Sequence, residues 1–473
     1  FHYYLCRQRS GGMEVSVKGS KPKGVGRAPL NPHFKPAGQS PPRAAQAGAR
    51  LPGFIHPPLK LKYLKRTRTS FAFASGDLPG TYDLRKKERV SPVKDQDGSG
   101  TCWAFATYGS LESCLLPEEK WDFSENNMKN LLSRDCPQGY DREPDGGGNQ
   151  YMSTAYLTRW GGPVNESDDP FEPLAPADCS VFPIQKQVLR ILFLPDRQNA
   201  TDNDSLKTAI MSYGAVFTSI YFEDESYQDQ NYTYYYQGKQ AANHAICLVG
   251  WDDRFDRNLF RDRPPQDGAF IAKNSWGTDW GEQGYFYVSY YDAVTGSNNA
   301  VFNRSENPSA YSLIYQNDPW GWVTSVGYGQ TSGWLANLFK SSQKNRIQAV
   351  SWYAASPLTT YELYIYQNPS PGQPRSGKLL QTLKGSIEVP SYFTRFLSSP
   401  LELQAGDVFS LVLLLNTPDY RYPIPTQMAI EGYSSQARSE SATSYISSDG
   451  QTWDDITVIW ANSSVCLKGL GTL

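Results

Sequence analysis

The sequence predicts an α+β fold for residues 77–303, followed by an all-β sandwich or jelly roll over residues 304–473. Helix-like spacing of apolar residues comes first, over residues 102–160, and strand-like runs dominate from about residue 206 onward. After about residue 303 the runs are short and separated by frequent turns, a pattern typical of β-sandwiches. At 473 residues the chain exceeds one ordinary domain, so we expect two or three.

The first predicted helix covers residues 102–116, because Ala104, Tyr108, Leu111 and Leu115 recur with helical spacing and Pro117 then ends the pattern. Two further helices are expected over residues 123–133 and 150–160. The strands expected in the same domain are residues 215–222, 244–251, 269–273 and 284–290. Those expected in the C-terminal domain lie within residues 346–353, 361–367, 408–415 and 444–460.

Residues 1–76 differ from the rest of the chain in charge and composition. They carry 14 Lys and Arg and one acid, a net charge of +13, whereas residues 77–473 carry 31 basic and 46 acidic residues, or −15. A solvated basic tail and a nucleic-acid-binding arm are two explanations. We favour a third, a detachable segment that is extended or disordered unless it is held against the acidic body.

The composition excludes several classes of function. No apolar run approaches the ~18–20 residues of a membrane-spanning helix, and the first residues lack the apolar core of a secretory signal. The seven cysteines form no CxxC pair. Only one histidine, His244, lies outside the first 56 residues, which argues against the common zinc sites. We expect no metal and no cofactor.

A cysteine and this lone histidine form a candidate nucleophile and base. Cys102 falls at the predicted start of a helix, where unpaired N–H groups and the helix dipole favour a thiolate. His244 lies in an apolar, strand-like run, and neutral imidazole is the usual base that activates a thiol. Each residue alone is more often a buried structural side chain. As a pair they predict a thiolate–imidazolium couple near neutral pH.

Several motifs in the expected order strengthen that pairing. Cys102 is followed by Trp103, and Asn274-Ser275-Trp276-Gly277 lies downstream of His244. Together with Gln96, these residues resemble the papain-like cysteine peptidases over roughly residues 78–292. The resemblance implies a two-lobed catalytic domain, with one helical lobe and one β-barrel-like lobe. It also implies four catalytic roles: Cys102 as nucleophile, His244 as base, Asn274 as the residue orienting the imidazole, and Gln96 as oxyanion donor.

The resemblance extends to substrate binding and disulfides. Gly147 and Gly148 match a glycine stretch that pairs with the substrate backbone, Trp276 would shield the His–Asn contact, and Asn243 is a further substrate-binding candidate. A Cys136–Cys179 bridge is implied by position. The family's usual bridge between the positions of Ser99 and Asp145 is missing, since neither position holds Cys.

The expected function is therefore that of a secreted or cell-surface cysteine endopeptidase, made as a precursor and acting on peptide or protein substrates. Residues 1–76 would be a strap-like inhibitory propeptide that crosses the cleft near residues 59–73. Neither a nucleic-acid partner nor a transmembrane segment is expected. The C-terminal domain resembles the lectin-like domain of some microbial relatives, and aromatics such as Trp320, Trp322, Trp334, Trp352 and Trp453 could bind a glycan or cell-surface ligand, although most should be core. Two alternatives remain: a binding or adhesion protein with a remnant peptidase domain, and an acyltransferase or peptide ligase.

Overall fold

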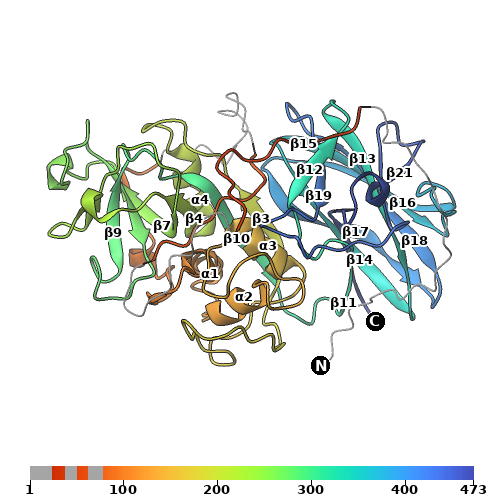
Figure 1. The fold of residues 1–473 in the computed structure, drawn as a ribbon, viewed down its shortest axis with the longest axis horizontal. Coiled ribbons are helices and arrows are strands. Elements are labelled where there is room, and N and C mark those ends of the chain that lie inside the picture. Colours follow the sequence, from red (N-terminus) through yellow and green to blue (C-terminus); the bar gives the residue numbers. More distant parts are fainter. Residues whose placement is uncertain (1–23, 38–50, 62–77) are drawn as a thin grey trace. The chain divides into compact units, whose positions relative to one another are not determined.

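The computed structural model describes residues 24–37, 51–61 and 78–473 (Figure 1). These residues form two compact units. One unit contains residues 32–37, 51–57 and 78–305, and the other contains residues 24–31, 58–61 and 306–473. The expected order of an α+β domain followed by a β-rich domain is confirmed. None of the helices among the described residues is both long and apolar enough to span a bilayer.

The helices of the first unit lie mostly before its strands. They are α1 (Cys102–Leu115), α2 (Glu125–Leu131), α3 (Gln150–Thr158) and α4 (Asp204–Tyr213). Side chains cap two of them: Ser124 Oγ accepts from Asn127 N at the start of α2, and Asn149 Oδ1 accepts from the first N–H groups of α3. Helix α1 is buried on every side from Cys102 to Ser113, so it forms the centre of this unit (Figure 1).

The β part of this unit is built around β7 (His244–Asp252), which pairs antiparallel with β4 (Val216–Ile220), β8 (Ala269–Lys273) and β2 (Thr81–Asp83). Cys247 on β7 lies opposite Lys273 on β8, so the start of β7 and the end of β8 share one edge. The order of strands is β3-β10-β4-β7-β8-β9-β6-β5. The remaining bounds are β3 (Gln187–Phe193), β5 (Tyr227–Gln228), β6 (Thr233–Tyr234), β9 (Tyr285–Ser289) and β10 (Ser297–Glu306).

The second unit consists almost entirely of strands. One sheet has the order β1-β12-β19-β22, a second β16-β15-β18-β13-β20-β21, and four further strands the order β11-β23-β14-β17. Their bounds are β1 (Gly26–Arg27), β11 (Leu313–Tyr315), β12 (Thr324–Gly327), β13 (Ser332–Lys340), β14 (Asn345–Ala354), β15 (Thr359–Gln367), β16 (Lys378–Ile387), β17 (Ser391–Leu403), β18 (Val408–Asn416), β19 (Ile424–Gln427), β20 (Ser444–Ser447), β21 (Asp454–Asp455), β22 (Ser464–Val465) and β23 (Leu467–Thr472).

The structure differs from the predicted local structure in two places. Residues 204–213, for which no element was predicted, form helix α4, whose face with Leu206, Ala209 and Ile210 is buried. The stretch 444–460 is not one strand-like run, because it divides into β20, β21 and the short helix α5 (Ile456–Ile459). The Asp449 carboxylate accepts from the N–H groups of Gln451 and Thr452, and this turn separates the pieces.

Candidate active site

Cys102 is the first residue of α1 and is fully buried. Its Sγ accepts a hydrogen bond from the backbone N of Ala245 at 3.3 Å. Ala245 directly follows His244 on β7, so the fold brings the thiol to the start of this strand although 143 residues separate the two. Helix α1 and strand β7 therefore supply the two predicted reactive groups from packed neighbouring elements.

The imidazole of His244 is oriented by Asn274, which follows the end of β8. The distance from His244 Nε2 to Asn274 Oδ1 is 2.8 Å, and the N–H of Ser275 also donates to this oxygen. Because Oδ1 accepts from Ser275, the oxygen can only accept from the ring, so Nε2 carries the proton. Nδ1 of His244 has no hydrogen-bond partner among the described residues. Nδ1 is thus the basic nitrogen.

Aromatic rings enclose this histidine. Trp276 stacks on His244 with a centroid distance of 4.7 Å, and Phe222 and Trp280 each pack edge-on against Trp276. The Trp276 ring is 5% exposed. It therefore shields the His244–Asn274 contact from water rather than offering an open surface to a ligand.

Gln96 is fully buried, and the backbone and side chains around it fix its amide. Its Oε1 accepts from Ser275 Oγ at 2.7 Å, and its Nε2 donates to the carbonyl oxygens of Ser99 and Leu51 at 2.6 and 2.9 Å. The bond from Ser275 orients the amide so that its N–H groups are available as donors. One of these bonds reaches a residue of the N-terminal segment.

Residues 51–57, which we call the strap, occupy the groove beside these residues. Gly148 N donates to Gly53 O at 2.9 Å, and Ile55 N donates to Gly148 O at 3.0 Å, which makes a parallel β-bridge between Phe54 and Gly148. On the other side, Phe54 N donates to Asn243 O at 2.8 Å. The strap is therefore bound as an extended peptide between the glycine stretch and the start of β7.

The predicted substrate-binding residues lie along this strap. A Cβ on Gly147 would lie 2.5 Å from the Ile55 side chain, and one on Gly148 would lie 2.4 Å from the Trp103 ring, so both positions require glycine. The Asn243 side chain instead holds the backbone of Phe222, through bonds of 2.7 and 3.0 Å. Only the Asn243 carbonyl faces the strap.

The strap in the groove is not the segment we expected. We expected residues 59–73 to cross the cleft, but residues 51–57 lie in the groove, and residues 58–61 belong to the other compact unit. Residues 62–73 lie outside the described residues. The strap passes so close to the Gly100 backbone that only glycine fits at residue 53.

With the strap bound, Cys102 and His244 do not form the thiolate–imidazolium pair that the sequence predicts. Burial raises the pKa of the Cys102 thiol to about 12, although the N–H groups of Ala245, Gly53 and Trp103 favour the thiolate. Burial likewise lowers the pKa of His244 to about 4, against the bond to Asn274. Both groups are therefore neutral near pH 7 in this state, because a dry site disfavours each charge.

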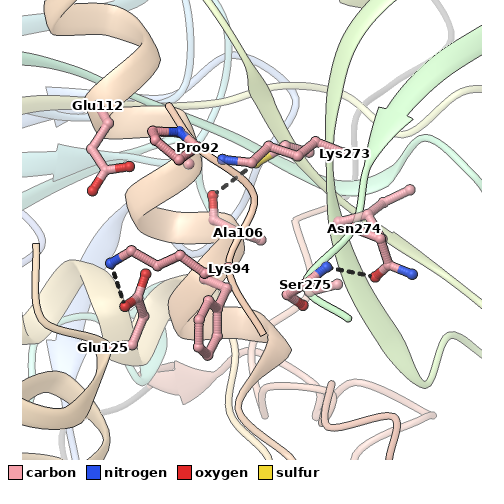
Figure 2. A pocket seen from close by; sticks show the side chains of 13 residues that line it. Pro92, Lys94, Ala106, Glu112, Glu125, Lys273, Asn274 and Ser275 are labelled. Atoms are coloured by element: carbon pink, nitrogen blue, oxygen red, sulfur yellow. Dashed lines mark hydrogen bonds and ion pairs between the residues drawn. The ribbon is translucent and has the colours of Figure 1, made fainter. Parts of the chain in front are cut away.

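A small cavity of about 20 Å³ lies behind the site, between α1 and the end of β8 (Figure 2). Figure 2 shows Asn274 and Ser275 at one end of its lining, and Lys94 with Glu125 at the other. Lys94 Nζ lies 2.8 Å from Glu125 Oε2, and Glu112 on α1 accepts from the Phe123 N–H. Lys94 lies two residues before Gln96, so this buried charge cluster lies on the segment that carries Gln96.

Cys136 and Cys179 are joined by a disulfide with a Cα–Cα distance of 5.4 Å. Cys102, Cys114, Cys247 and Cys466 are thiols, and Cys6 lies outside the described residues. At the position of the absent family bridge, the N–H of Gly100 donates to the Asp145 carbonyl at 2.8 Å. Among the described residues, no group of three or more His, Cys, Asp or Glu side chains is arranged to hold a metal ion.

Comparison with known families divides the chain in the same place. Residues 78–303 match the papain family of cysteine proteases, and residues 314–471 match a family described as a lectin-like domain. Pro-cathepsin H of Mus musculus is 29% identical over 238 residues, which is 47% of this chain and 63% of that protein. A cathepsin L-like peptidase of Aedes aegypti is 29% identical over 217 residues, 45% of this chain and 59% of that protein. The chain thus spans about three fifths of these relatives.

A solved structure has a similar fold over nearly the whole chain. It contains the cysteine protease and lectin-like domains of Cwp84, a surface-layer-associated protein of Clostridium difficile. The two share 22% identity with a TM-score of 0.79, covering 96% of this chain and 99% of that one. Cwp84 after propeptide cleavage matches 83% of this chain with a TM-score of 0.74. Residues 78–303 therefore form a papain-family cysteine protease domain, which is followed by a lectin-like domain.

Proposed function

We propose that this protein is a cysteine endopeptidase that hydrolyses peptide bonds through an acyl-enzyme on Cys102. His244 Nδ1 takes the thiol proton, and the thiolate attacks the peptide carbonyl carbon. The Gln96 amide and the N–H of Cys102 stabilise the oxyanion. His244 then protonates the departing amine, and water attacks the thioester to release the acid and regenerate the thiol. Asn274 holds the imidazole in the tautomer that each step requires.

The bound strap is the single observation that carries this proposal. An extended peptide already lies against Gly148 and Asn243, and its Leu51 carbonyl accepts from Gln96. The groove therefore accepts a peptide main chain beside a thiol, an oriented imidazole and an amide donor. Backbone pairing of this kind is how a groove binds an extended peptide.

We further propose that residues 1–76 are the enzyme's own inhibitory segment, with 77–303 as catalytic domain and 304–473 as lectin-like domain. The strap engages the glycine stretch and the amide of Gln96, which are groups that a substrate needs. With the strap in place Cys102 and His244 are fully buried, and this burial disfavours their charged forms. An inhibited precursor follows from the occupied groove and from the neutral pair.

The test compares the full chain with its Cys102→Ala variant at several pH values, with and without a peptidyl epoxide. We expect the parent chain to shorten from its N-terminus, to hydrolyse a peptide and to be labelled at Cys102, and the variant to do none of these. Shortening of both forms at equal rates would refute self-processing. A processed chain that hydrolyses no peptide would refute the peptidase.

Analysis of the reaction products distinguishes a peptidase from two alternative functions. An acyltransferase would join a peptide to an added amine faster than to water, which product analysis with an amine acceptor would reveal. An adhesion protein with a remnant domain would lack turnover. Its retention of Cys102, His244, Asn274 and Gln96 in bonded positions argues against a remnant.

For the lectin-like domain we propose a glycan or another cell-surface ligand, and a secreted or surface-associated protein. Trp320, Trp322 and Trp352 are buried and serve the core. Trp334 and Trp453 are partly exposed and pack edge-on. Binding of polysaccharides by the full chain, compared with its Trp334→Ala variant, tests this assignment.

A further inference from the structure

The glycine stretch that binds the strap is held through its backbone: Gly146 N donates to Glu143 O at 3.0 Å, and Gly146 O accepts from Trp103 Nε1 at 3.4 Å. Glycines 146–148 have no side chains to anchor them, and glycine loses more backbone freedom on ordering than any other residue. The disulfide that resembling peptidases have at this point is replaced here by Ser99 and Asp145. Side chains from outside this stretch therefore contribute to holding its backbone C=O and N–H groups where they can pair with an extended peptide.

Arg142 makes those contacts. Its Nε donates to Gly147 O at 2.8 Å, and its Nη2 donates to Gly146 O at 2.8 Å and to Pro144 O at 2.7 Å. The Nη1 atom donates to the carbonyl of Lys129 on α2 at 2.6 Å. One guanidinium thus ties the glycine stretch to a helix of the same lobe through four carbonyl groups.

The same side chain is linked to the reactive end of α1. The guanidinium lies over the ring of Trp103, with its central carbon 4.9 Å from the ring centroid, and Trp103 directly follows Cys102. Arg142 is only 4% exposed. Burial lowers the pKa of Arg142 to about 9, so the group stays protonated near pH 7. A planar cation with several fixed donors suits this role better than the single ammonium of lysine.

We propose that Arg142 is a positioning residue that holds the glycine stretch for pairing with the main chain of a substrate, in place of the missing disulfide. The inference rests on the proposed peptidase function. Arg142 does not touch the reacting atoms. Its loss should weaken peptide binding and leave the chemistry at Cys102 nearly intact.

The kinetic test uses Arg142→Lys, with Arg159→Lys as a matched control. Arg159 is another buried arginine of this lobe, and it donates to the carbonyls of Gln138 and Leu131. After release of the N-terminal segment, we expect Arg142→Lys to raise the KM for a peptide about tenfold, the equivalent of one lost hydrogen bond. Its kcat and its alkylation by iodoacetamide, which does not use the glycine stretch, should stay within about twofold of the parent enzyme.

A second measurement on the full chain does not depend on turnover. Backbone amide hydrogen exchange at residues 143–149 should become faster in Arg142→Lys and stay unchanged in Arg159→Lys. The Gly148 N–H donates to the strap, and we expect this bond to open more often when Arg142 no longer holds the glycine stretch. An unchanged KM and unchanged exchange would overturn the proposal, as would equal effects of both variants. A parent enzyme without peptidase activity would refute the proposed function, and the exchange result would still decide the role of Arg142.

Discussion

Gly53 of the strap lies against Gly100 so closely that a Cβ on Gly53 would be 1.8 Å from the Gly100 carbonyl oxygen. No backbone adjustment of a few tenths of an ångström can relieve such an overlap, so a side chain at residue 53 is incompatible with the bound strap. Gly100 lies two residues before Cys102, so this close contact holds the strap next to the thiol.

The first prediction is that Gly53→Ala yields a precursor whose strap does not seat. Labelling of Cys102 in the full-length precursor by a peptidyl epoxide should become at least about tenfold faster, since displacement of the strap exposes the thiol. Mass spectrometry of the intact chain measures it. The control is Gly80→Ala, where an added Cβ would meet nothing within 4 Å. Equal labelling of Gly53→Ala and the parent precursor would mean that the strap does not limit access.

The second prediction concerns the amide donor. Gln96→Ala should lower kcat by about 10²–10³, the usual cost of one oxyanion donor. Alkylation of Cys102 by iodoacetamide should change little in the processed enzyme, because that reaction forms no oxyanion. Since Ser275 also bonds to Gln96, thermal unfolding must be followed in parallel. A folded variant with full activity would remove Gln96 from the proposed role.

The candidate catalytic residues could be named from the sequence because their proposed roles depend on short local motifs. Cys102, Gln96, His244 and Asn274 each sit at a recognisable junction between elements, and the fold brings them to one edge. The strap could not be placed, because its position depends on contacts with residues far along the chain. Arg142 was missed for the same reason, since an arginine in a charged loop has no sequence signal of burial.

Helix α1 was predicted correctly from one apolar face, but its full burial was not. It is buried on all sides from Cys102 to Ser113, so the polar residues on its other face carry no information about exposure. The ionisation of the pair was predicted for a hydrated cleft. In the structure with the strap bound both groups are fully buried, and this burial, which the sequence does not show, favours their neutral forms.

The third prediction is a pH dependence of the precursor's stability. Burial lowers the pKa of His244 from 6.5 to about 4. The stability that depends on a neutral His244 is therefore fully present above pH 6.5 and is lost as the pH falls toward 4. The loss is about 3 kcal/mol, from the size of that shift. Urea unfolding measures the unfolding free energy at each pH. Between pH 6.5 and pH 4 this free energy should fall by about 3 kcal/mol less in His244→Gln than in the parent precursor.

Ionic strength separates this effect from attraction between the basic N-terminal segment and the acidic body. Salt screens contacts between exposed charges but has little effect on a fully buried ring. The difference between the parent chain and His244→Gln should therefore be the same in low and high salt. Disappearance of that difference in salt would assign the pH dependence to surface charge.

The last prediction tests the charge cluster behind the site. Lys94 and Lys273 are both cations of this cluster, and Lys94 Nζ lies 2.8 Å from Glu125 Oε2 and 3.6 Å from Glu166 Oε2. The Glu125 side chain is only 2% exposed. Lys94→Met removes the cation that pairs with these two carboxylates, and breaking a buried pair in this way costs about 3–5 kcal/mol of unfolding free energy. Lys120→Met, at an exposed lysine of the same lobe, should change it by less than about 0.5 kcal/mol.

The stability loss caused by Lys94→Met should depend on pH, in a direction that the protonation of Glu125 sets. Burial raises the pKa of this carboxyl even with Lys94 nearby, and the loss of the cation raises it further. The protonated acid needs no counter-charge, so Lys94→Met should lie closer to the parent chain at pH 5 than at pH 8. Chemical unfolding of both proteins at the two pH values measures this difference. A larger loss at pH 5 would show that the Glu125 carboxylate is stabilised by groups other than Lys94.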